Sequence, residues 1–381
     1  MHFGIDVLLK NENPDSVGRI ALVTNDVAVT SSAIPSRKAL IDRGFRLNRL
    51  FSPEHGLSAA GADGLRQDDH VDPVTGLPVI SLYGDKMAPN HSDLEGIDAV
   101  YFDIPDIGCR FYTYLWTMTY VMESCAEARI PFTVLDRPNP TGADLSLAEG
   151  PWLDEQHCTS FIGRWNIPIR HCCTLGELAG YFKALRIPKL SLQVIPVPSY
   201  DRKSHSKKDL PFIPTSPAIQ NLQSARCYPG TCLAEGLNLN EGRGTEYSFR
   251  VYAAPWLEVN DLIIEIEKNP LAGITFEACR FKAVFPPYKG EWCPGICWAV
   301  TDPETFHPVQ TGWQLLRLIR LLHPDRLRPR PYPTAANPSG KNHLDLLLGI
   351  ENAVYLLLND SEPNTAIDSD WQKEIGPFLL Y

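Results

Sequence analysis

The most constraining feature of this 381-residue chain is an alternation of short apolar runs with helix-forming segments over its first 135 residues. The apolar runs are rich in Val, Ile and Phe and end in turn-forming residues, as buried strands do. Short links join each run to the segment that follows. This pattern is typical of a parallel sheet built from strand–helix–strand units. We predict strands at residues 20–23, 45–51, 77–82, 99–104 and 132–135, and helices at residues 33–43 and 111–128.

Acidic side chains follow three of these predicted strands. Glu54 and His55 come after the second strand, Asp103 and Asp106 end the fourth, and Asp136 follows the fifth. The carboxyl ends of parallel strands lie at one edge of a sheet, where open α/β folds bind their ligands. We therefore expect these side chains to converge on one crevice.

The alternation loosens after residue 150, where Pro and aromatic residues become frequent. We predict an α/β protein with two domains: a Rossmann-like parallel-sheet domain over residues 1–160, and a smaller mixed α+β domain over residues 161–381. In the second domain we predict helices at residues 175–185, 255–268, 312–322 and 343–348, strands at 192–197, 249–252, 275–284 and 296–300, a turn at 228–230 and a charged loop at 203–209.

A glycine-rich segment of the second domain gathers acidic, amide and guanidinium groups. Glu235 and Asn238 precede it, and Glu241 and Arg243 lie among its glycines. Glycine lets the backbone approach a ligand closely, and the neighbouring side chains offer hydrogen-bond donors and acceptors. We interpret the segment as a ligand-binding loop; the alternative is a loop that binds only its own backbone.

Composition disfavours several classes of function. The formal charge of −10 argues against a general affinity for nucleic acid or anionic membranes. No apolar run is long enough to span a bilayer, and the N-terminus lacks the features of a signal peptide, so we expect a cytoplasmic protein or one whose leader has been removed. Neither nucleotide-binding glycine motif occurs, and no Cys or His spacing suggests zinc, so we expect no cofactor and no metal.

Six blocks of this sequence resemble the exo-β-N-acetylmuramidases, a family of glycoside hydrolases long catalogued as a domain of unknown function. They are SPEHG (residues 52–56), FDI-x-D-x-G-x-RFYTY (102–114), DRPNP (136–140), EGP (149–151), NLQS with YPG (221–230) and EGRGT (241–245). The resemblance implies a Rossmann-like domain, a smaller C-terminal domain and a cleft between them. It also implies release of N-acetylmuramic acid (MurNAc) from the non-reducing end of peptidoglycan fragments such as MurNAc-GlcNAc, with Glu54 as the catalytic acid.

Cleavage of a glycosidic bond needs a proton donor to the leaving oxygen and a second group on the opposite face of the sugar. We predict that Glu54 is the donor and that His55 orients it or binds a hydroxyl group. The candidates for the second group are the acetamido carbonyl of the substrate and four carboxylates, Glu241, Glu235, Asp103 and Asp106.

Muramic acid carries a lactyl carboxylate, which a guanidinium binds with two parallel hydrogen bonds. For this role we favour Arg110 or Arg243 over Arg137 and Arg170. A structural pair with Asp136 is an equal expectation for Arg137. The residues predicted to contact the sugar are Asp103, Asp106, Arg110, Tyr112, Asp136, Arg137, Asn139, Arg170, Glu235, Asn238 and Arg243.

Three alternatives remain open at this point. The first is a hydrolase of an amide or ester bond, because acids and a histidine alone do not determine which bond is cleaved. A metal-dependent hydrolase of another bond would use His55, Asp103 and Asp136 as ligands. A non-catalytic amino-sugar-binding protein would use the same cleft without turnover. In either sugar-binding interpretation the partner is a small saccharide, not nucleic acid or a membrane, and the oligomeric state stays open.

Overall fold

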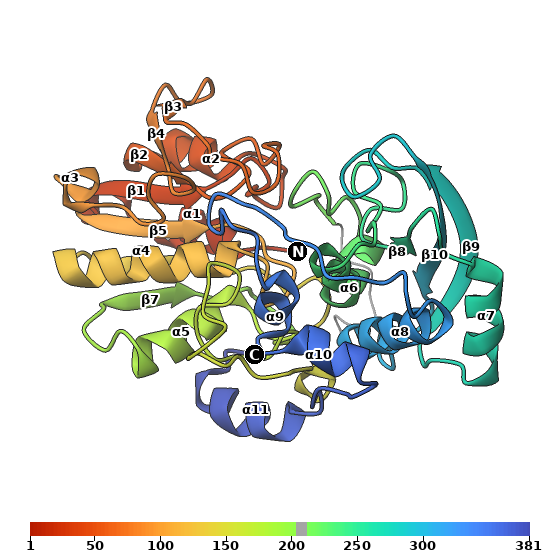
Figure 1. Ribbon diagram of the computed structural model, residues 1–381. Helices are drawn as coiled ribbons and strands as arrows, with labels where there is room; N and C mark the ends of the chain where they lie inside the picture. Colours follow the sequence, from red (N-terminus) through yellow and green to blue (C-terminus); the bar gives the residue numbers. More distant parts are fainter. Residues whose placement is uncertain (203–211) are drawn as a thin grey trace.

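The computed structural model describes residues 1–202 and 212–381, and its largest element is a seven-stranded sheet (Figure 1). The strand order is β3-β4-β2-β1-β5-β6-β7, and all neighbours are parallel except β3, which runs antiparallel to β4. This confirms the predicted α/β class. The predicted loop at residues 203–209 lies outside the described residues. The strands are β1 (Arg19–Thr24), β2 (Arg46–Ser52), β3 (His70–Val71), β4 (Pro78–Ser81), β5 (Ala99–Asp103), β6 (Phe132–Leu135) and β7 (Leu192–Ile195).

Alternate residues of β1 show why helices cover both faces of this sheet. Ile20 and Leu22 belong to one buried cluster, whereas Ala21 and Val23 belong to another. Successive side chains of a strand point to opposite faces, so a strand buried on both faces needs a helical layer on each. One layer contains α1 (Gly4–Asn11) and α2 (Ser36–Arg43), and the other contains α3 (His91–Leu94), α4 (Tyr114–Ala128) and α5 (Leu175–Leu185).

The sheet continues past residue 160, where the sequence suggested a boundary. β7 pairs in parallel with β6, and α5 connects the two strands over their buried face. α5 begins with a capping box, in which the hydroxyl of Thr174 accepts from the N–H of Glu177 and the Glu177 carboxylate accepts from the N–H of Thr174. We call this whole unit, with its seven strands and five helices, the N-terminal lobe.

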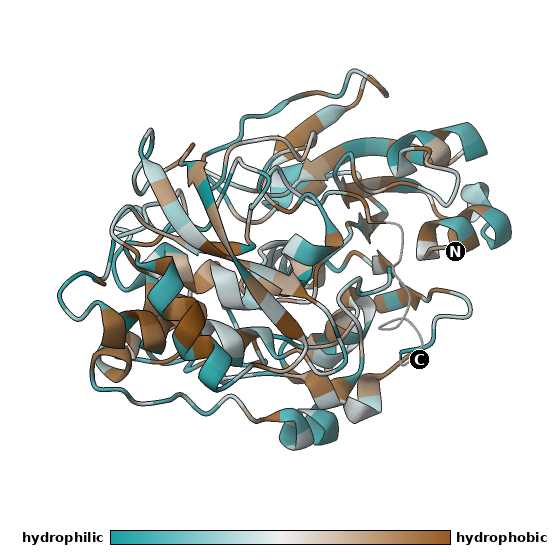
Figure 2. Ribbon diagram, turned by 90° about the vertical axis from the view of Figure 1, so that its right-hand side faces the viewer, coloured by the Kyte–Doolittle hydropathy of each residue, from teal (hydrophilic) through white to brown (hydrophobic). Residues whose placement is uncertain are grey.

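The C-terminal lobe is built on a three-stranded antiparallel sheet of order β8-β10-β9. Its helix α7 buries Val259, Leu262 and Ile266, which lie three and four residues apart on one face. Figure 2 views this side of the molecule, where brown apolar and teal polar segments share the helices. The elements are α6 (Leu222–Thr231), β8 (Val251–Ala253), α7 (Val259–Lys268), β9 (Ile274–Lys282), β10 (Trp292–Val300) and α8 (Pro308–Leu322).

The predicted turn at residues 228–230 is wrong, because these residues lie within α6. Pro229 and Gly230 are poor helix formers, but tertiary packing overrides this preference. A Cβ on Gly230 would lie 2.1 Å from the carbonyl oxygen of Pro308, and a Cβ on Gly312 would lie 2.8 Å from the Cα of Gly230. α6 and α8 therefore cross glycine against glycine, and this close packing keeps the segment helical.

The last helices return toward the N-terminal lobe. α9 (His343–Leu348) packs against residues 232–236, α10 (Ala353–Leu358) packs on α8 and α9, and α11 (Asp368–Ile375) packs on α5. Figure 1 shows them in the lower middle, where the lobes meet. Trp116, Trp298 and Trp371 belong to one buried cluster that spans both lobes. Among residues 1–202 and 212–381, no helix combines the length and apolar character needed to cross a lipid bilayer.

Candidate active site

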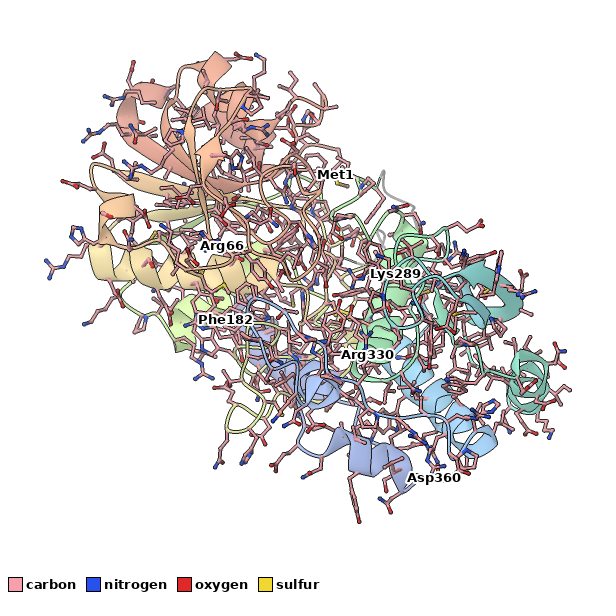
Figure 3. The ribbon with its side chains drawn as sticks, turned by 45° about the horizontal axis from the view of Figure 1, so that its top comes forward. Met1, Arg66, Phe182, Lys289, Arg330 and Asp360 are labelled. Carbon is pink, nitrogen blue, oxygen red and sulfur yellow. The ribbon has the colours of Figure 1, made fainter. Side chains whose placement is uncertain are left out.

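A pocket lies between the two lobes. Glu54, His55 and Asp63 line it from the N-terminal lobe, and Glu235 and Arg243 line it from the C-terminal lobe. Figure 3 shows the side chains of both lobes as sticks, with Arg66 of the N-terminal lobe and Arg330 of the C-terminal lobe labelled. Aromatic walls with a few polar groups are usual in small-molecule sites. The aromatic lining residues are Tyr83, Phe111, Tyr112, Phe161, Tyr228, Phe249 and Tyr332.

Glu54 is only 6% exposed at the end of β2. Its Oε1 accepts a hydrogen bond from the N–H of Gly64 (3.0 Å), and its Oε2 accepts one from the hydroxyl of Thr113 (2.7 Å). Burial raises the pKa of Glu54 above its ordinary value; the charge of Asp63 adds to this rise and His55 opposes it. A carboxyl group with a raised pKa keeps its proton over more of the pH range, which a general acid requires.

His55 lies next to Glu54 in the left-handed backbone region (φ 66°). Its Nδ1 is 2.8 Å from the carbonyl oxygen of Gly61. A carbonyl oxygen only accepts, so Nδ1 carries a hydrogen and Nε2 is left for another partner. The structure thus places the predicted pair of Glu54 and His55 in one pocket.

Arg243 joins the two lobes at this pocket. Its Nη1 lies 3.3 Å from Oδ1 of Asp63, its Nη2 lies 2.5 Å from Oε1 of Glu235, and its Nε lies 3.1 Å from Oε1 of Glu241. The guanidinium also lies 4.9 Å above the ring of Phe249. Burial by itself lowers the pKa of Arg243, but Asp63 and the other acids hold that pKa well above its ordinary value. The side chain is therefore a charged cross-link between the lobes.

Only one of the two acids predicted near Arg243 lines the pocket. Oε2 of Glu235 lies 3.3 Å from Nε2 of His343, whose ring stacks on Tyr332 with centroids 4.6 Å apart. Glu241, predicted to be catalytic, is 2% exposed and lies behind Arg243, outside the pocket lining. Burial raises the pKa of Glu241, and its Oε2 has no hydrogen-bond partner among the described residues.

The expectation that acids from three strand ends meet in one crevice is wrong. β2 lies two strands from β5 and three from β6, which separates their ends by roughly 10 and 14 Å at the usual strand spacing. Asp103 binds Arg137 instead, with Nε–Oδ1 and Nη2–Oδ2 distances of 2.6 and 3.0 Å. Because Asp103 and Arg137 pair with each other inside the protein, neither the predicted acid nor this predicted sugar-binding arginine is available to the pocket.

Asp136 has a structural partner at the start of α5. It accepts hydrogen bonds from the hydroxyl of Thr174 (2.7 Å) and from the N–H of Gly176 (2.9 Å). A Cβ on Gly176 would lie 2.6 Å from Cγ of Asp136, so only glycine permits this approach. Burial raises the pKa of Asp136 to about 6. The metal ligand set of His55, Asp103 and Asp136 is therefore not assembled, and no group of three or more His, Cys, Asp or Glu side chains in the described parts is arranged to hold a metal.

Arg110, a favoured candidate for the lactyl carboxylate, points into the protein interior. It is fully buried and donates to the carbonyl oxygens of Pro151 (2.7 Å), Ile167 (2.8 Å), Leu347 (3.2 Å) and Leu348 (2.6 Å). Burial lowers the pKa of Arg110 to about 10. Its donors hold the end of α9 against the N-terminal lobe and do not reach the pocket.

Four further predicted sugar contacts also lie outside the pocket, and one lies inside. Tyr112 lines it, with its hydroxyl bonded to that of Thr215 at 2.7 Å. Asp106 accepts from the N–H of Gly108 (2.7 Å) near the end of β5. The other three donate to backbone carbonyl oxygens: Arg170 to Phe306 (2.9 Å), Asn139 to Cys173 (3.2 Å) and Asn238 to Arg326 (2.9 Å).

Several residues that line the pocket are absent from the sequence-based prediction of the site, among them Asp63, Tyr332 and His343. Asp63 shares the glycine-containing loop of Glu54, a signal that identifies it as a candidate. Tyr332 and His343 lie in or near a proline-rich segment that matches no motif. Only the packing of this segment against the Glu54 loop brings them to the site.

A buried carboxyl with a raised pKa, beside a second carboxylate and among aromatic rings, defines a glycosidase-type site on an α/β fold. Models of the exo-β-N-acetylmuramidase NamZ match most of the chain, the N-terminal one over residues 20–223 and the C-terminal one over residues 226–379. The chain belongs to this exo-β-N-acetylmuramidase family of glycosidases, which confirms the resemblance seen in the sequence.

Individual relatives agree with this assignment. The chain is 38% identical over 325 residues to the peptidoglycan β-N-acetylmuramidase NamZ of Bacillus subtilis, covering 84% of this chain and 78% of that protein. Two solved structures of DUF1343 family proteins from Bacteroides fragilis share the fold, with TM-scores of 0.85 and 0.72 at 28% and 26% identity. Each comparison covers 100% of this chain and 98% of the other.

Proposed function

We propose that this protein is an exo-β-N-acetylmuramidase that releases MurNAc from the non-reducing end of peptidoglycan fragments such as MurNAc-GlcNAc. The observation that carries this proposal is the buried acid Glu54 in a pocket between the lobes, in a chain 38% identical to a muramidase. All ten cysteines are free thiols and nine are buried, which supports action in a reducing compartment such as the cytoplasm.

In this proposal Glu54 starts the reaction as the general acid. Its proton goes to the glycosidic oxygen, the bond from that oxygen to the anomeric carbon breaks, and the electron pair leaves with the GlcNAc alcohol. In the same proposal Nε2 of His55, the ring nitrogen that does not contact the carbonyl of Gly61, binds a sugar hydroxyl. The deprotonated Glu54 then takes a proton from the water that attacks the anomeric carbon.

We assign the second role, attack on the anomeric carbon, to the acetamido carbonyl oxygen of the substrate. The bond that this oxygen forms to the anomeric carbon breaks when the water attacks, which restores the acetamido group. This assignment is supported by where the protein carboxylates lie. Glu235 is held by Arg243 and His343, and Glu241 lies behind Arg243. Asp103 and Asp106 are outside the pocket. A substrate acetamido group performs this step in other glycosidases.

We propose that the lactyl carboxylate of the substrate binds on the Arg243 side of the pocket. Of the four arginines considered, Arg110, Arg137 and Arg170 bind protein groups outside the pocket, whereas Arg243, which also pairs with protein carboxylates, lines it. His343 lies on the same side through its contact with Glu235. A substrate carboxylate there meets a guanidinium and an imidazole, the groups that bind anions best.

The test is incubation of the purified protein with MurNAc-GlcNAc and detection of the two free sugars by mass spectrometry. The matched control substrate is GlcNAc-GlcNAc, which lacks the lactyl group. We expect release from the first substrate only. Saccharide binding without release would favour the non-catalytic sugar-binding alternative, and activity abolished by dialysis against a chelator would favour the metal-dependent one.

A further inference from the structure

Asp63 is a second carboxylate on the loop of Glu54, and the C-terminal half of the chain holds it from two sides. The hydroxyl of Tyr332 donates to Oδ2 at 2.6 Å, and Nη1 of Arg243 lies 3.3 Å from Oδ1. The side chain is 29% exposed because it faces the pocket. One oxygen thus accepts a hydrogen bond and the other forms an ion pair with a guanidinium, an arrangement that favours a charged carboxylate.

The residue after Asp63 binds Glu54 directly. The N–H of Gly64 donates to Oε1 of Glu54 at 3.0 Å, while the carbonyl of Gly64 accepts from the N–H of Ala335 at 2.7 Å. Gly64 has a left-handed backbone (φ 67°), and a Cβ there would lie 2.8 Å from Cγ2 of Thr334. The segment at residues 334–335 therefore fixes Gly64, and with it the placement of both carboxyl groups.

The surroundings shift the pKa values of Asp63 and Glu54 in opposite directions. Burial raises the pKa of Asp63, but Arg243, His55 and the hydroxyl of Tyr332 outweigh it, so that pKa lies below its ordinary value. The pKa of Glu54 is raised, first by burial and then by Asp63 against the opposing charge of His55. When the pKa values of two neighbouring carboxyl groups are shifted apart in this way, one group is ionised and the other is protonated at a pH between the two values. The titratable and charged groups that face the pair are His55, Tyr83, Tyr114, Tyr228, Tyr332, His343 and Arg243, with Glu235 beside Arg243 and Glu241 behind it.

We propose that Asp63 is a positioning residue, which Tyr332 and Arg243 hold in its ionised form so that its negative charge keeps the proton on Glu54. This inference rests on the proposed function, because it describes how the general acid of that reaction is prepared. Asp63 acts through Glu54 and forms no bond to the sugar. The ionisation of Asp63 then sets the acidic limb of the pH profile, and the ionisation of Glu54 sets the alkaline limb.

The test measures kcat/KM against pH for wild type and Asp63→Asn, with MurNAc-GlcNAc as the substrate. Asparagine keeps the shape of the side chain and removes its charge. We expect the alkaline limb to move to lower pH by about one unit or more, the usual size of a like-charge effect between close carboxyls. Loss of structure alone would lower kcat/KM at every pH and leave the limb in place.

A second substrate separates an effect through Glu54 from direct action on the sugar. The nitrophenolate of 4-nitrophenyl β-MurNAc leaves without a proton, so Asp63→Asn should keep at least a tenth of the wild-type kcat/KM on it, given that acid catalysis supplies about 10²–10⁴. An alkaline limb that does not move, or loss of activity on both substrates in a folded variant, overturns the inference.

Tyr332→Phe gives an independent test if Asp63→Asn does not fold. The variant removes the hydroxyl that favours the charged form of Asp63, so the acidic limb should move to higher pH. The matched control is Tyr252→Phe, which removes a hydroxyl that donates to Gly230 at 2.7 Å outside the pocket. We expect no shift of either limb in this control, and no shift in Tyr332→Phe overturns the inference.

The outcomes also separate this inference from the proposed function. If the wild-type protein releases no MurNAc, the proposed function fails and there is no profile to shift. If the wild type releases MurNAc and the limbs stay unmoved in Asp63→Asn and Tyr332→Phe, only the role of Asp63 fails.

Discussion

Replacing Glu54 by glutamine removes the transferable proton and preserves the shape of the side chain. The amide oxygen of glutamine still accepts from the N–H of Gly64, where Oε1 of Glu54 now accepts at 3.0 Å. The amide nitrogen faces the hydroxyl of Thr113, which now donates to Oε2 at 2.7 Å and turns to accept instead. Both side-chain contacts of residue 54 are therefore kept in the variant. We therefore expect a change of less than about 1 kcal/mol in the free energy of unfolding.

The catalytic loss follows from the leaving group. An alcohol of GlcNAc is a poor leaving group without a proton, and general acid catalysis contributes about 10²–10⁴ in rate. We expect Glu54→Gln to lose this factor on MurNAc-GlcNAc, which corresponds to roughly 3–5 kcal/mol of activation free energy. The loss on a 4-nitrophenyl glycoside should be much smaller, because nitrophenolate departs unprotonated.

The assay is kcat/KM on both substrates, with unfolding by urea measured in parallel. Glu149→Gln is the matched control, because Glu149 is also a buried glutamate with a raised pKa but caps α8 outside the pocket. Its kcat/KM should stay within about twofold of wild type, as expected for a residue without contact to the reacting groups. A folded Glu54→Gln protein with near wild-type activity on the disaccharide would refute the assignment of Glu54 as the acid.

Three further predictions follow from residues whose roles the tertiary structure defines. Arg110→Lys keeps the charge but cannot reach four carbonyl oxygens, so the free energy of unfolding should fall by about 2–4 kcal/mol, with KM unchanged. Urea denaturation measures this fall, and a raised KM at unchanged stability would contradict the prediction. Arg243→Lys should raise KM for MurNAc glycosides more than for GlcNAc glycosides, and an equal rise for both would argue against carboxylate recognition there. Burial raises the pKa of Glu149 from 4.5 to about 7, so its contribution to stability is full below pH 4.5 and is lost as the pH rises to 7. Glu149→Gln should therefore gain stability relative to wild type across that range, by roughly 3 kcal/mol at most, and urea denaturation at several pH values would show a constant difference if this reasoning is wrong.

The local sequence pattern predicted the bounds of several helices and strands of this fold. The predicted bounds of β6, α5 and α9 coincide with the observed ones, and those of β1, β2 and β4 differ by one or two residues. In each case a short apolar run or a capping box determines the element through neighbours in sequence. The turn predicted at Tyr228 to Gly230 failed for the opposite reason, since the packing of Gly230 against Gly312 overrides a local preference.

Sequence alone therefore led to the α/β class, the family and the loop that carries Glu54, because these depend on periodicity and on residues that are adjacent in the chain. The assembly of the pocket depends on contacts between distant segments. Arg137 takes Asp103 away from the site, and Tyr332 and Arg243 reach Asp63 from the far half of the chain. Whether a charged side chain faces the pocket or a protein partner is decided by which groups can satisfy it once it is buried, and only tertiary packing supplies those groups.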